Sequence, residues 1–512
     1  MLLERLSSCL LSFLATSTGF EPTAPERNCR SRTANDNQAI MTTTQDKIAP
    51  EEFDLVVLGS GEGSKFLAWT LARQGKRVAV IERRWIGGSC PNIACLPSKN
   101  IIHSAKVASF FARAAEFGIS SDGFEVRVGE VTNRKRKMVE GLVEIHLRNF
   151  KDSGVDLLLG HGQFVGPKTI QVDLADGTTR VVRGENVVIG TGTRARLDGI
   201  PGLAEAEPLT HIEGLELEEL PEHLVVLGGG YVGLEFAQAM RRLGSRVTIL
   251  ERSSALLPRE DRDAAAALEN LLRDEGIELL LNSKIDQVSG LCGQTVRIAY
   301  SQGTESRAVD GTHLLVALGR TPNTSEIGLE LAGVELTDLG YIKVNERLET
   351  TAPGVWAIGE SAGSPQFTHI AYDDFRIVRD NLAGGNRVTT GRQVPLVLFT
   401  DPELARVGIT ETEATAKQIP YRLFKIPMAS VLRTRTLSET SGFMKDLVEA
   451  DDRILGFTVF GVDGGEIMSV VQVAMIAGLP YTALRDAILA HPTLAEGLTV
   501  LFSSTPQVEM QP

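Results

Sequence analysis

Two cysteines separated by four residues, Cys90 and Cys95, are the side chains whose type and spacing most clearly suggest chemistry. They lie in the segment 87–100, which reads GGSCPNIACLPSKN. A disulfide between them closes a loop of about six residues and is worth only ~2 kcal/mol, so it would be a weak structural cross-link. Apolar residues recur with helical spacing after Cys95, which places this thiol near a helix N-terminus, where the helix dipole favours the thiolate. The pair therefore predicts a redox-active dithiol.

Two other interpretations of the cysteine pair remain open at this point, a metal site and two buried free thiols. Zinc sites need four ligands, usually two pairs of Cys or Cys and His at short spacing. The other three cysteines, Cys9, Cys29 and Cys292, show no such pairing. A redox role is favoured over both alternatives, and no metal site is predicted.

The composition is that of an ordinary globular protein. The chain has 512 residues and 43% hydrophobic content, enough for about three domains with sizeable cores. Lys and Arg number 52 against 65 for Asp and Glu, and the resulting charge of -13 disfavours nucleic acid or an anionic membrane as a partner. Five cysteines with one close pair do not make a secreted disulfide framework, so we expect a cytoplasmic location.

The first fifty residues differ from the rest of the chain. A weak apolar patch lies before residue 15, and a polar stretch without periodicity follows. The patch is too short to span a membrane, and a secretory signal peptide would have a clearer positive end and a longer apolar run. We expect a disordered N-terminal extension over residues 1–50, or a biological start at Met41.

A glycine-rich turn comes before the cysteine pair and follows a short apolar run at residues 52–58. Gly59, Gly61 and Ser64 occupy the three positions of a GxGxxG motif, and a helix-like stretch then leads to a second strand that ends at Glu82. In such a unit the glycines let a pyrophosphate approach the helix N-terminus, and the acid holds a ribose hydroxyl. Ser64 in place of the third glycine is expected to hold helix and strand slightly further apart.

The same unit recurs later in the chain, with Gly228, Gly230 and Gly233 after an apolar run and Glu251 at the end of the next one. The interval from the first glycine to the acid is 23 positions in both copies. One GxGxxG motif is a weak signal, but two copies in register are a strong one. Two dinucleotides are therefore implied, and only the first unit runs on into the cysteine pair.

Three more strand-like runs end in a glycine or an acid: one before Gly190 and Gly192, one before Gly319, and one before Glu360. The first two runs are interpreted as segments in which the chain crosses between domains, and the third as a strand that brings the chain back to the first nucleotide. After Pro395 the pattern changes to alternating segments and a helix. This change predicts a third domain of mixed α and β structure.

By these motifs the chain resembles the class I pyridine nucleotide-disulfide oxidoreductases, the family of dihydrolipoyl dehydrogenase, glutathione reductase and mercuric reductase. The resemblance implies an α/β fold with two Rossmann-like dinucleotide-binding domains, for FAD and NAD(P), and a C-terminal α+β dimerisation domain. The expected domains are residues 51–195 and 325–394 for FAD, 196–324 for NAD(P), and 395–512 for dimerisation.

The resemblance also implies FAD on the first unit and NAD(H), with NADP(H) as the alternative, on the second. Glu251 favours NADH because it would accept a hydrogen bond from the ribose 2′-hydroxyl and repel a 2′-phosphate, although Arg252 beside it weakens the case. Tyr231 is expected to cover the nicotinamide pocket. Where the family usually has Asp, this chain has Glu360, so a rearranged contact to the flavin side chain is expected. The implied cofactor-binding residues are Gly59, Gly61, Ser64, Glu82, Lys99, Gly192, Gly228, Gly230, Tyr231, Gly233, Glu251, Gly319 and Glu360.

In the family the second cysteine faces the flavin as a thiolate, and the first exchanges with substrate. A lysine after the pair is matched with a glutamate after the second glycine motif, near flavin N5. A histidine and a glutamate near the C-terminus form an acid-base dyad that acts across a homodimer interface on the partner's disulfide. The implied catalytic residues are Cys90, Cys95, Lys99, Glu235, His491 and Glu496.

The substrate is expected to be a small dithiol or disulfide of the dihydrolipoamide kind. Mercuric reductases resemble the chain along much of its length, but they carry a C-terminal cysteine pair that residues 505–512 lack, and they lack the His491–Glu496 dyad. Two alternatives remain open: reduction of Hg(II), and a catalytically idle flavoprotein that serves as a scaffold.

Overall fold

The computed structural model describes residues 49–120, 123–197 and 199–509, so nearly all of the predicted N-terminal extension lies outside the described residues. The first sheet is built around β1 (Glu51–Leu58), which is short, apolar and buried and pairs in parallel with its two neighbours on either side. These neighbours are β2 (Val78–Glu82) and β5 (Thr179–Ile189). The remaining strands of this six-stranded sheet are β3 (Asp156–Gly166), β4 (Thr169–Leu174) and β15 (Val355–Ala357).

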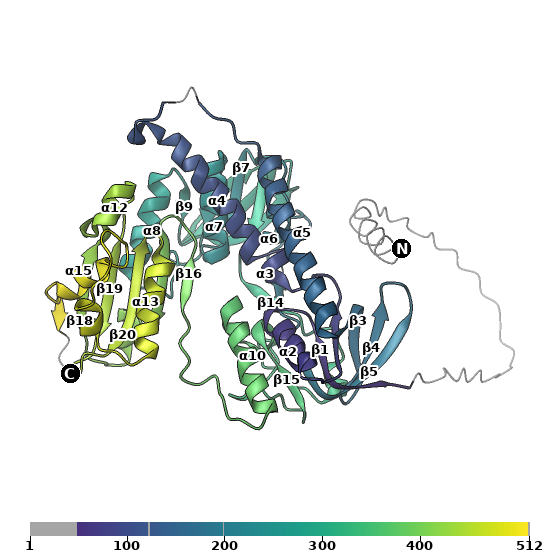
Figure 1. The fold of residues 1–512 in the computed structure, drawn as a ribbon. Coiled ribbons are helices and arrows are strands. Elements are labelled where there is room, and N and C mark those ends of the chain that lie inside the picture. The colour runs from purple at the N-terminus through teal and green to yellow at the C-terminus, as the bar shows by residue number, and fades with distance from the viewer. Residues whose placement is uncertain (1–48, 121–122, 198, 510–512) are drawn as a thin grey trace, which may run out of the picture. The chain divides into compact units, whose positions relative to one another are not determined.

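Strand β15 reaches this sheet from far along the chain and pairs in parallel with β5, as the predicted return to the first nucleotide requires. Helices α2 (Glu62–Arg73) and α10 (Thr368–Leu382) pack against each other beside the sheet (Figure 1). The turn between β1 and α2 is the first glycine motif. The first strand-turn-helix-strand unit is therefore confirmed.

The segment after β2 carries the cysteines on two helices, α3 (Ser89–Asn92) and α4 (Cys95–Ala112). Helix α4 begins at Cys95, as the helical spacing predicted, and a short 3-10 turn, η1 (Ala114–Phe117), follows it. The long helix α5 (Val128–Ser153) then returns to β3 and packs on α2, α3 and α4.

The second unit forms its own four-stranded parallel sheet, in the order β13-β7-β8-β9. Apolar residues of its strands and of α7 pack in two clusters, one on each face. The elements of this part are β7 (His223–Leu227), α7 (Tyr231–Leu243), β8 (Arg246–Leu250), α8 (Arg262–Asp274), β9 (Glu278–Leu280), β13 (His313–Val316), the short helix α6 (His211–Gly214), and the antiparallel strands β10 (Lys284–Gly290), β11 (Val296–Gln302) and β12 (Glu305–Gly311).

The two predicted domain crossings, β6 (Thr193–Ala195) and β14 (Arg320–Pro322), pair with each other as a two-stranded antiparallel ribbon. Helix α9 (Leu329–Ala332) follows and packs on β3. The sheets change at this ribbon, beside the predicted boundaries at 195 and 324. The boundaries themselves stay predictions.

The C-terminal part is a six-stranded antiparallel sheet, in the order β16-β17-β20-β19-β18-β21, with helices packed on it (Figure 1). This is the mixed domain that the change of pattern after Pro395 predicted. Its strands are β16 (Leu396–Leu398), β17 (Glu403–Gly408), β18 (Arg422–Pro427), β19 (Phe443–Val448), β20 (Ile454–Gly461) and β21 (Val508–Glu509). Its helices are α11 (Glu411–Ala416), α12 (Leu432–Leu437), α13 (Gly464–Ile476), α14 (Tyr481–Arg485) and α15 (Gly497–Ser503).

Candidate active site

The two cysteines lie on consecutive helices just after β2. Cys90 is the second residue of α3, and Cys95 is the first residue of α4. Both are partly buried free thiols, so the structure shows the dithiol form of the pair. The N-terminal end of the 18-residue helix α4 therefore places the positive end of its dipole at Cys95.

Cys95 is the acidic thiol of the pair. A hydrogen bond from Cys90, reinforced by the hydroxyl of Thr368 and the charge of Lys99, lowers the pKa of Cys95 to about 6, although burial opposes the shift. Thr368 Oγ1 lies 3.1 Å from Cys95 Sγ. The same bond to Cys95, together with burial, raises the pKa of Cys90. At neutral pH the reduced pair therefore keeps one proton, on Cys90, and one negative charge, on Cys95.

Lys99 follows Cys95 by one helical turn, and its Nζ lies 2.8 Å from Glu235 Oε2 on α7. The other carboxylate oxygen of Glu235 accepts the backbone N–H of Phe399 at 3.0 Å, and Lys99 Nζ lies 4.6 Å from the centre of the Phe399 ring. Glu235 is only 7% exposed. The structure thus brings the predicted lysine and glutamate together, next to the cysteine pair.

The first glycine turn fits a bound dinucleotide phosphate. Gly59 has φ +97°, and a Cβ there would lie 2.5 Å from the carbonyl oxygen of Gly190, so only glycine fits. At Gly61 the nearest atom to such a Cβ is 3.8 Å away, which leaves room in front of α2. The buried hydroxyls of Ser64 and Thr191 have no hydrogen-bond partner among the described residues. The open turn, the helix N-terminus and the two free hydroxyls suit the pyrophosphate of FAD.

Ser64 does not hold α2 away from the sheet, and the expectation of a looser contact is wrong. A Cβ on Gly190, directly after β5, would clash with Ser64 Oγ. The serine therefore fills space that glycine leaves free at position 190. The close approach of helix and sheet is preserved because the small residue is on the strand side.

Glu82 is buried at the end of β2, where the ribose prediction requires an acid. One of its oxygens accepts Ser60 N at 2.9 Å and Ser60 Oγ at 2.7 Å, and the other accepts the backbone N–H groups of Arg84 and Trp85. A carboxylate offers about four acceptor positions, so a ribose hydroxyl must replace one of these donors. The Ser60 hydroxyl is the one that can rotate away.

Glu360 lies in the 3-10 turn η2 (Gly359–Ala362), and its carboxylate reaches the interdomain ribbon. Its Oε2 accepts the Thr193 hydroxyl of β6 and lies 3.1 Å from Arg320 Nε of β14. The predicted cofactor residues Gly192 and Gly319 directly precede these two strands. Glu360 thus forms an ion pair with Arg320, and its rearranged contact to the flavin side chain stays a prediction.

The second glycine turn has the same construction as the first. Gly228 has φ +104°, and a Cβ there would lie 2.6 Å from the carbonyl oxygen of Ala317, while a Cβ at Gly233 would clash with Gly228. No atom of the described residues lies within 4 Å of a Cβ built at Gly230, so this position has room for a ligand. The turn therefore fits a second dinucleotide.

Glu251 ends the adjacent strand and accepts the backbone N–H groups of Gly229 and Ser253, each at 2.8 Å. Two of its acceptor positions remain for a ribose diol. Arg252 beside it is exposed. This arrangement supports the predicted contact of Glu251 with NADH.

Tyr231, the predicted cover of the nicotinamide pocket, is held by a polar chain that sequence reasoning missed. Its hydroxyl donates to Glu260 Oε1 at 3.1 Å, and Glu260 Oε2 lies 2.8 Å from Arg406 Nε on β17. Burial, followed by the nearby Glu260 charge, raises the pKa of Tyr231. The ring lies 6.3 Å from that of Phe367, one residue before Thr368. The C-terminal domain is thus linked, through Glu260, to the side chain predicted to cover the nicotinamide.

His491 and Glu496 form the predicted pair in the C-terminal domain. His491 Nδ1 lies 2.9 Å from Glu496 Oε2, and the imidazole is 60% exposed. Within this chain the hydrogen bonds of Cys95 go to Cys90 and Thr368. The dyad is thus formed and open to a second copy of the chain.

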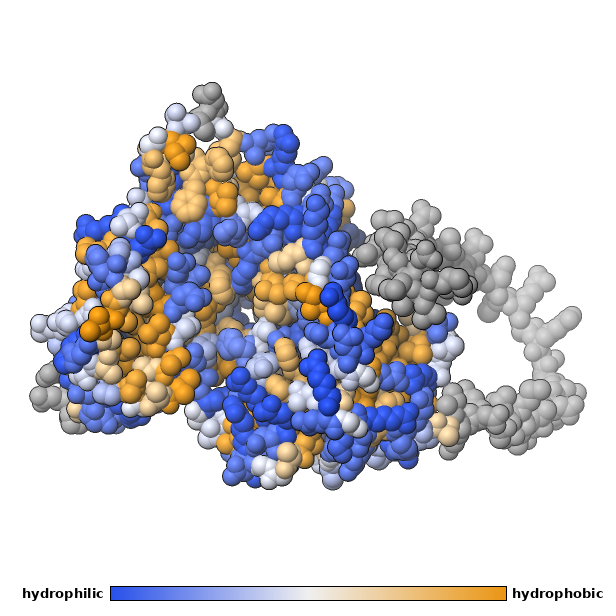
Figure 2. All heavy atoms as spheres, viewed as in Figure 1, coloured by the Kyte–Doolittle hydropathy of each residue, from blue (hydrophilic) through white to orange (hydrophobic). Residues whose placement is uncertain are grey.

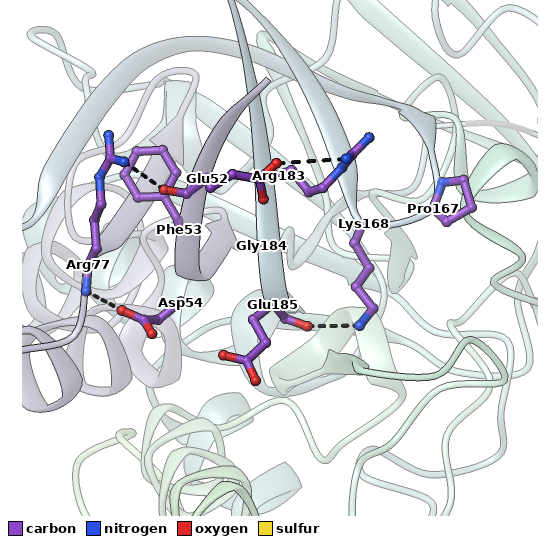
Figure 3. A pocket seen from close by; sticks show the side chains of 9 residues that line it. All are labelled: Glu52, Phe53, Asp54, Arg77, Pro167, Lys168, Arg183, Gly184 and Glu185. Atoms are coloured by element: carbon purple, nitrogen blue, oxygen red, sulfur yellow. Dashed lines mark hydrogen bonds and ion pairs between the residues drawn. The ribbon is translucent and has the colours of Figure 1, made fainter. Parts of the chain in front are cut away.

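Figure 3 shows a hollow at the opposite end of the first sheet, beside the start of β1. Charged side chains of this hollow have partners within it: Asp54 accepts the backbone N–H of Arg77, and Lys168 Nζ donates to the carbonyl oxygen of Glu185. None of the predicted site residues lines it.

The fold and the site together define an enzyme that binds two dinucleotides and carries an acidic dithiol between them. Residues 53–374 match the family model described as pyridine nucleotide-disulphide oxidoreductase, and residues 394–501 match the dimerisation domain of the same family. The chain belongs to the pyridine nucleotide-disulphide oxidoreductase family. It is a flavoprotein disulfide oxidoreductase that uses FAD and NAD(P)H.

Similar proteins include a probable pyridine nucleotide-disulfide oxidoreductase, RclA, of Escherichia coli, 38% identical over 88% of this chain and 99% of the relative. Pea mitochondrial dihydrolipoyl dehydrogenase is 32% identical over 88% of this chain and 90% of the relative. Mercuric reductase of Shewanella putrefaciens is 33% identical over 94% of this chain and 85% of the relative. A solved Cu(II) complex of E. coli RclA superposes with a TM-score of 0.81 at 36% identity, covering 88% and 99%. Among the described residues, no helix combines the length and apolar character needed to cross a membrane.

Proposed function

We propose that electrons pass from NADH through FAD to the Cys90–Cys95 pair, and from there to a small dithiol/disulfide substrate of the dihydrolipoamide kind. The observation that carries this proposal is the hydrogen-bonded pair of His491 and Glu496. A thiol leaving group must take up a proton as a disulfide opens, and an imidazole held by a carboxylate suits that task. Bound FAD supplies the two-electron carrier between nicotinamide and dithiol.

The chain's own residues divide the thiol chemistry as follows. Cys90 attacks one sulfur of the substrate disulfide while His491 takes the Cys90 proton, and His491 then returns that proton to the departing sulfur. The Cys95 thiolate next attacks the Cys90 sulfur, which releases the second substrate sulfur to be protonated from solvent. The enzyme disulfide has formed, and the substrate has gained two electrons and two protons. Oxidation of a dithiol runs through the same steps in reverse.

The proposal places His491 beside the cysteine pair of a second copy in a homodimer. The match to a dimerisation domain supports this arrangement, as do the large apolar side chains exposed on and after α13. Hydrophobic residues gather over this region in Figure 2. The exposed residues are Val473, Ile476, Leu479 and Ile488, with exposed fractions of 66%, 70%, 44% and 102%.

Metal-ion reduction is the second candidate, because the solved structures of a 36% identical relative include Cu(II) complexes and another relative is a mercuric reductase. Thiolates bind soft metal ions, so Cys90 and Cys95 provide ligands for such a substrate. This reaction has no need of His491. The two candidates therefore differ in their dependence on the histidine.

The test is a parallel assay of NADH oxidation with lipoamide, glutathione disulfide, Hg(II) plus excess thiol, and Cu(II). We expect lipoamide turnover that falls by about a hundredfold in His491→Ala, since general acid-base catalysis contributes ~10²–10⁴. His103→Ala, which changes an exposed histidine of α4, is the matched control and keeps wild-type rates. Turnover of a metal ion but of no disulfide, unaffected by His491→Ala, would overturn the proposal.

The proposed compartment is the cytoplasm. This proposal rests on the cysteine content alone, because only one of the possible pairings is close in sequence. Recovery of the protein in a cytoplasmic fraction checks it.

A further inference from the structure

Lys65 is a lysine buried inside the first dinucleotide unit. It lies in the first turn and a half of α2 and is only 3% exposed. Its ammonium group has three partners: Glu62 Oε2 at 2.7 Å, His146 Nε2 at 2.9 Å and the carbonyl oxygen of Gly87 at 3.3 Å. Burying a charge is costly unless it is paired and hydrogen-bonded, and here all three N–H donors are used.

The histidine partner is neutral. His146 on α5 donates Nδ1–H to the carbonyl oxygen of Leu142 at 2.6 Å, which leaves Nε2 to accept from Lys65. Burial, followed by the Lys65 charge, lowers the pKa of His146. Glu62 is therefore the one group in this cluster whose negative charge balances Lys65.

The third partner, Gly87, begins the turn that leads to the cysteine pair. Gly87 and Gly88 have φ of +88° and +81°, and a Cβ on Gly88 would lie 2.5 Å from Gly61 Cα. The two backbones are therefore in contact at this point. Glu62 follows Gly61 directly and Cys90 follows Gly88 by two residues, so the carboxylate and the thiol belong to segments that are in contact.

The charge of Glu62 acts against ionisation of Cys90, after the larger effects of Cys95 and burial. The other groups that act on the thiol are the Thr368 hydroxyl of α10 and the Cys95 thiolate of α4. Without a counter-charge, Glu62 would add a second negative charge beside the Cys95 thiolate. Cys90 would then be harder to convert to its nucleophilic form.

We propose that Lys65 is a positioning residue for the substrate-exchanging thiol, which keeps Cys90 reactive by neutralising Glu62 and by holding the Gly87–Gly88 turn against α2 and α5. This role rests on the proposed function only in taking Cys90 as the thiol that attacks substrate. It assigns a function to a partly buried Glu-Lys-His cluster that neither glycine motif nor cysteine pair explains. Lys65 acts through Glu62 and the turn, and it does not touch the substrate.

The test measures the rate of Cys90 alkylation by iodoacetamide against pH in the FAD-loaded, two-electron-reduced enzyme, with the modified cysteine identified by mass spectrometry. Lys65→Met leaves Glu62 unpaired, so the midpoint of the pH profile should rise by about one unit, which is tenfold slower alkylation at a pH below both midpoints. The double variant Glu62→Gln/Lys65→Met removes both charges and should return close to the wild-type profile. Lys76→Met, which breaks an exposed ion pair to Asp54, is the matched control and should leave the profile unchanged.

If Lys65→Met does not retain FAD, Glu62→Gln alone still tests the proposal, because the unopposed Lys65 charge should then lower the midpoint. Equal slowing in Lys65→Met and in the double variant would show that charge compensation is not the role of Lys65. An unchanged midpoint in Glu62→Gln would also show that charge compensation is not the role of Lys65. Alkylation needs no physiological substrate, so failure of this proposal is separate from failure of lipoamide to turn over.

Discussion

Replacing Thr368 by valine tests how the chain keeps Cys95 ionised. The substitution preserves the shape of the side chain but removes the hydroxyl that lies 3.1 Å from Cys95 Sγ. A hydrogen bond to a charged group is worth about 1.5–3 kcal/mol. We take the lower end because sulfur is a weak acceptor, which corresponds to about one pKa unit. The Cys90 bond, the Lys99 charge and the helix terminus remain in the variant.

The readout is the long-wavelength absorbance that a thiolate gives beside oxidised flavin, recorded across pH after anaerobic reduction by two electron equivalents. The thiolate is the absorbing form, so the band is present above the Cys95 pKa and is lost as pH falls through it. In the wild type the loss should be centred at about pH 6. In Thr368→Val it should be centred about one unit higher, at about pH 7. Cys95→Ser should show no such band at any pH.

Ser98→Ala is the matched control, because the Ser98 hydroxyl donates to the carbonyl oxygen of Cys95 at 3.1 Å and not to its sulfur. In this control the long-wavelength band should be lost at the same pH as in the wild type. If the Thr368→Val band disappears at the wild-type pH, the hydroxyl does not stabilise the thiolate. The low pKa of Cys95 would then have to come from Cys90, Lys99 and the helix alone.

Three further predictions concern the nucleotide and the dimer. The kcat/KM for NADH should exceed that for NADPH at least fivefold, because Glu251 repels a 2′-phosphate at about 1 kcal/mol or more, and a preference for NADPH would contradict this. Mixing inactive Cys90→Ser protein with inactive His491→Ala protein should restore part of the activity once subunits exchange, whereas a monomer in sedimentation would exclude it. Arg406→Met should loosen Tyr231 by weakening its hydrogen-bonded chain, so the KM for NADH should change by about fivefold, while equal KM values would mean that Arg406 has no influence on the tyrosine.

The parts of the fold that were predicted correctly are those set by neighbouring residues. A glycine with positive φ between an apolar strand and a helix leaves a direct mark on the sequence, and Gly59 and Gly228 both carry it. The helix after Cys95 was recognisable for the same reason, from its spacing of apolar residues. The pairing of Lys99 with Glu235 could be expected only from the family resemblance, because 136 positions separate the two residues.

The missed residues owe their importance to distant contacts. Thr368 is one threonine among many, and its role depends on a thiol 273 positions away. Arg406 and Glu260 are 146 positions apart, and neither belongs to a motif. The wrong expectation about Ser64 has a similar cause, because the glycine that makes room for it lies on another strand. The spacing of residues in the sequence shows structure that is set by neighbouring residues, but it does not show contacts between distant residues.

The ribbon of β6 and β14 has a mechanical consequence for the enzyme. The two chain crossings pair with each other through three residue pairs, so they form one ribbon and not two separate linkers. Glu360 binds both strands of this ribbon, through Thr193 on one strand and Arg320 on the other. Both chain crossings are thereby anchored to one carboxylate on the flavin-binding side of the molecule.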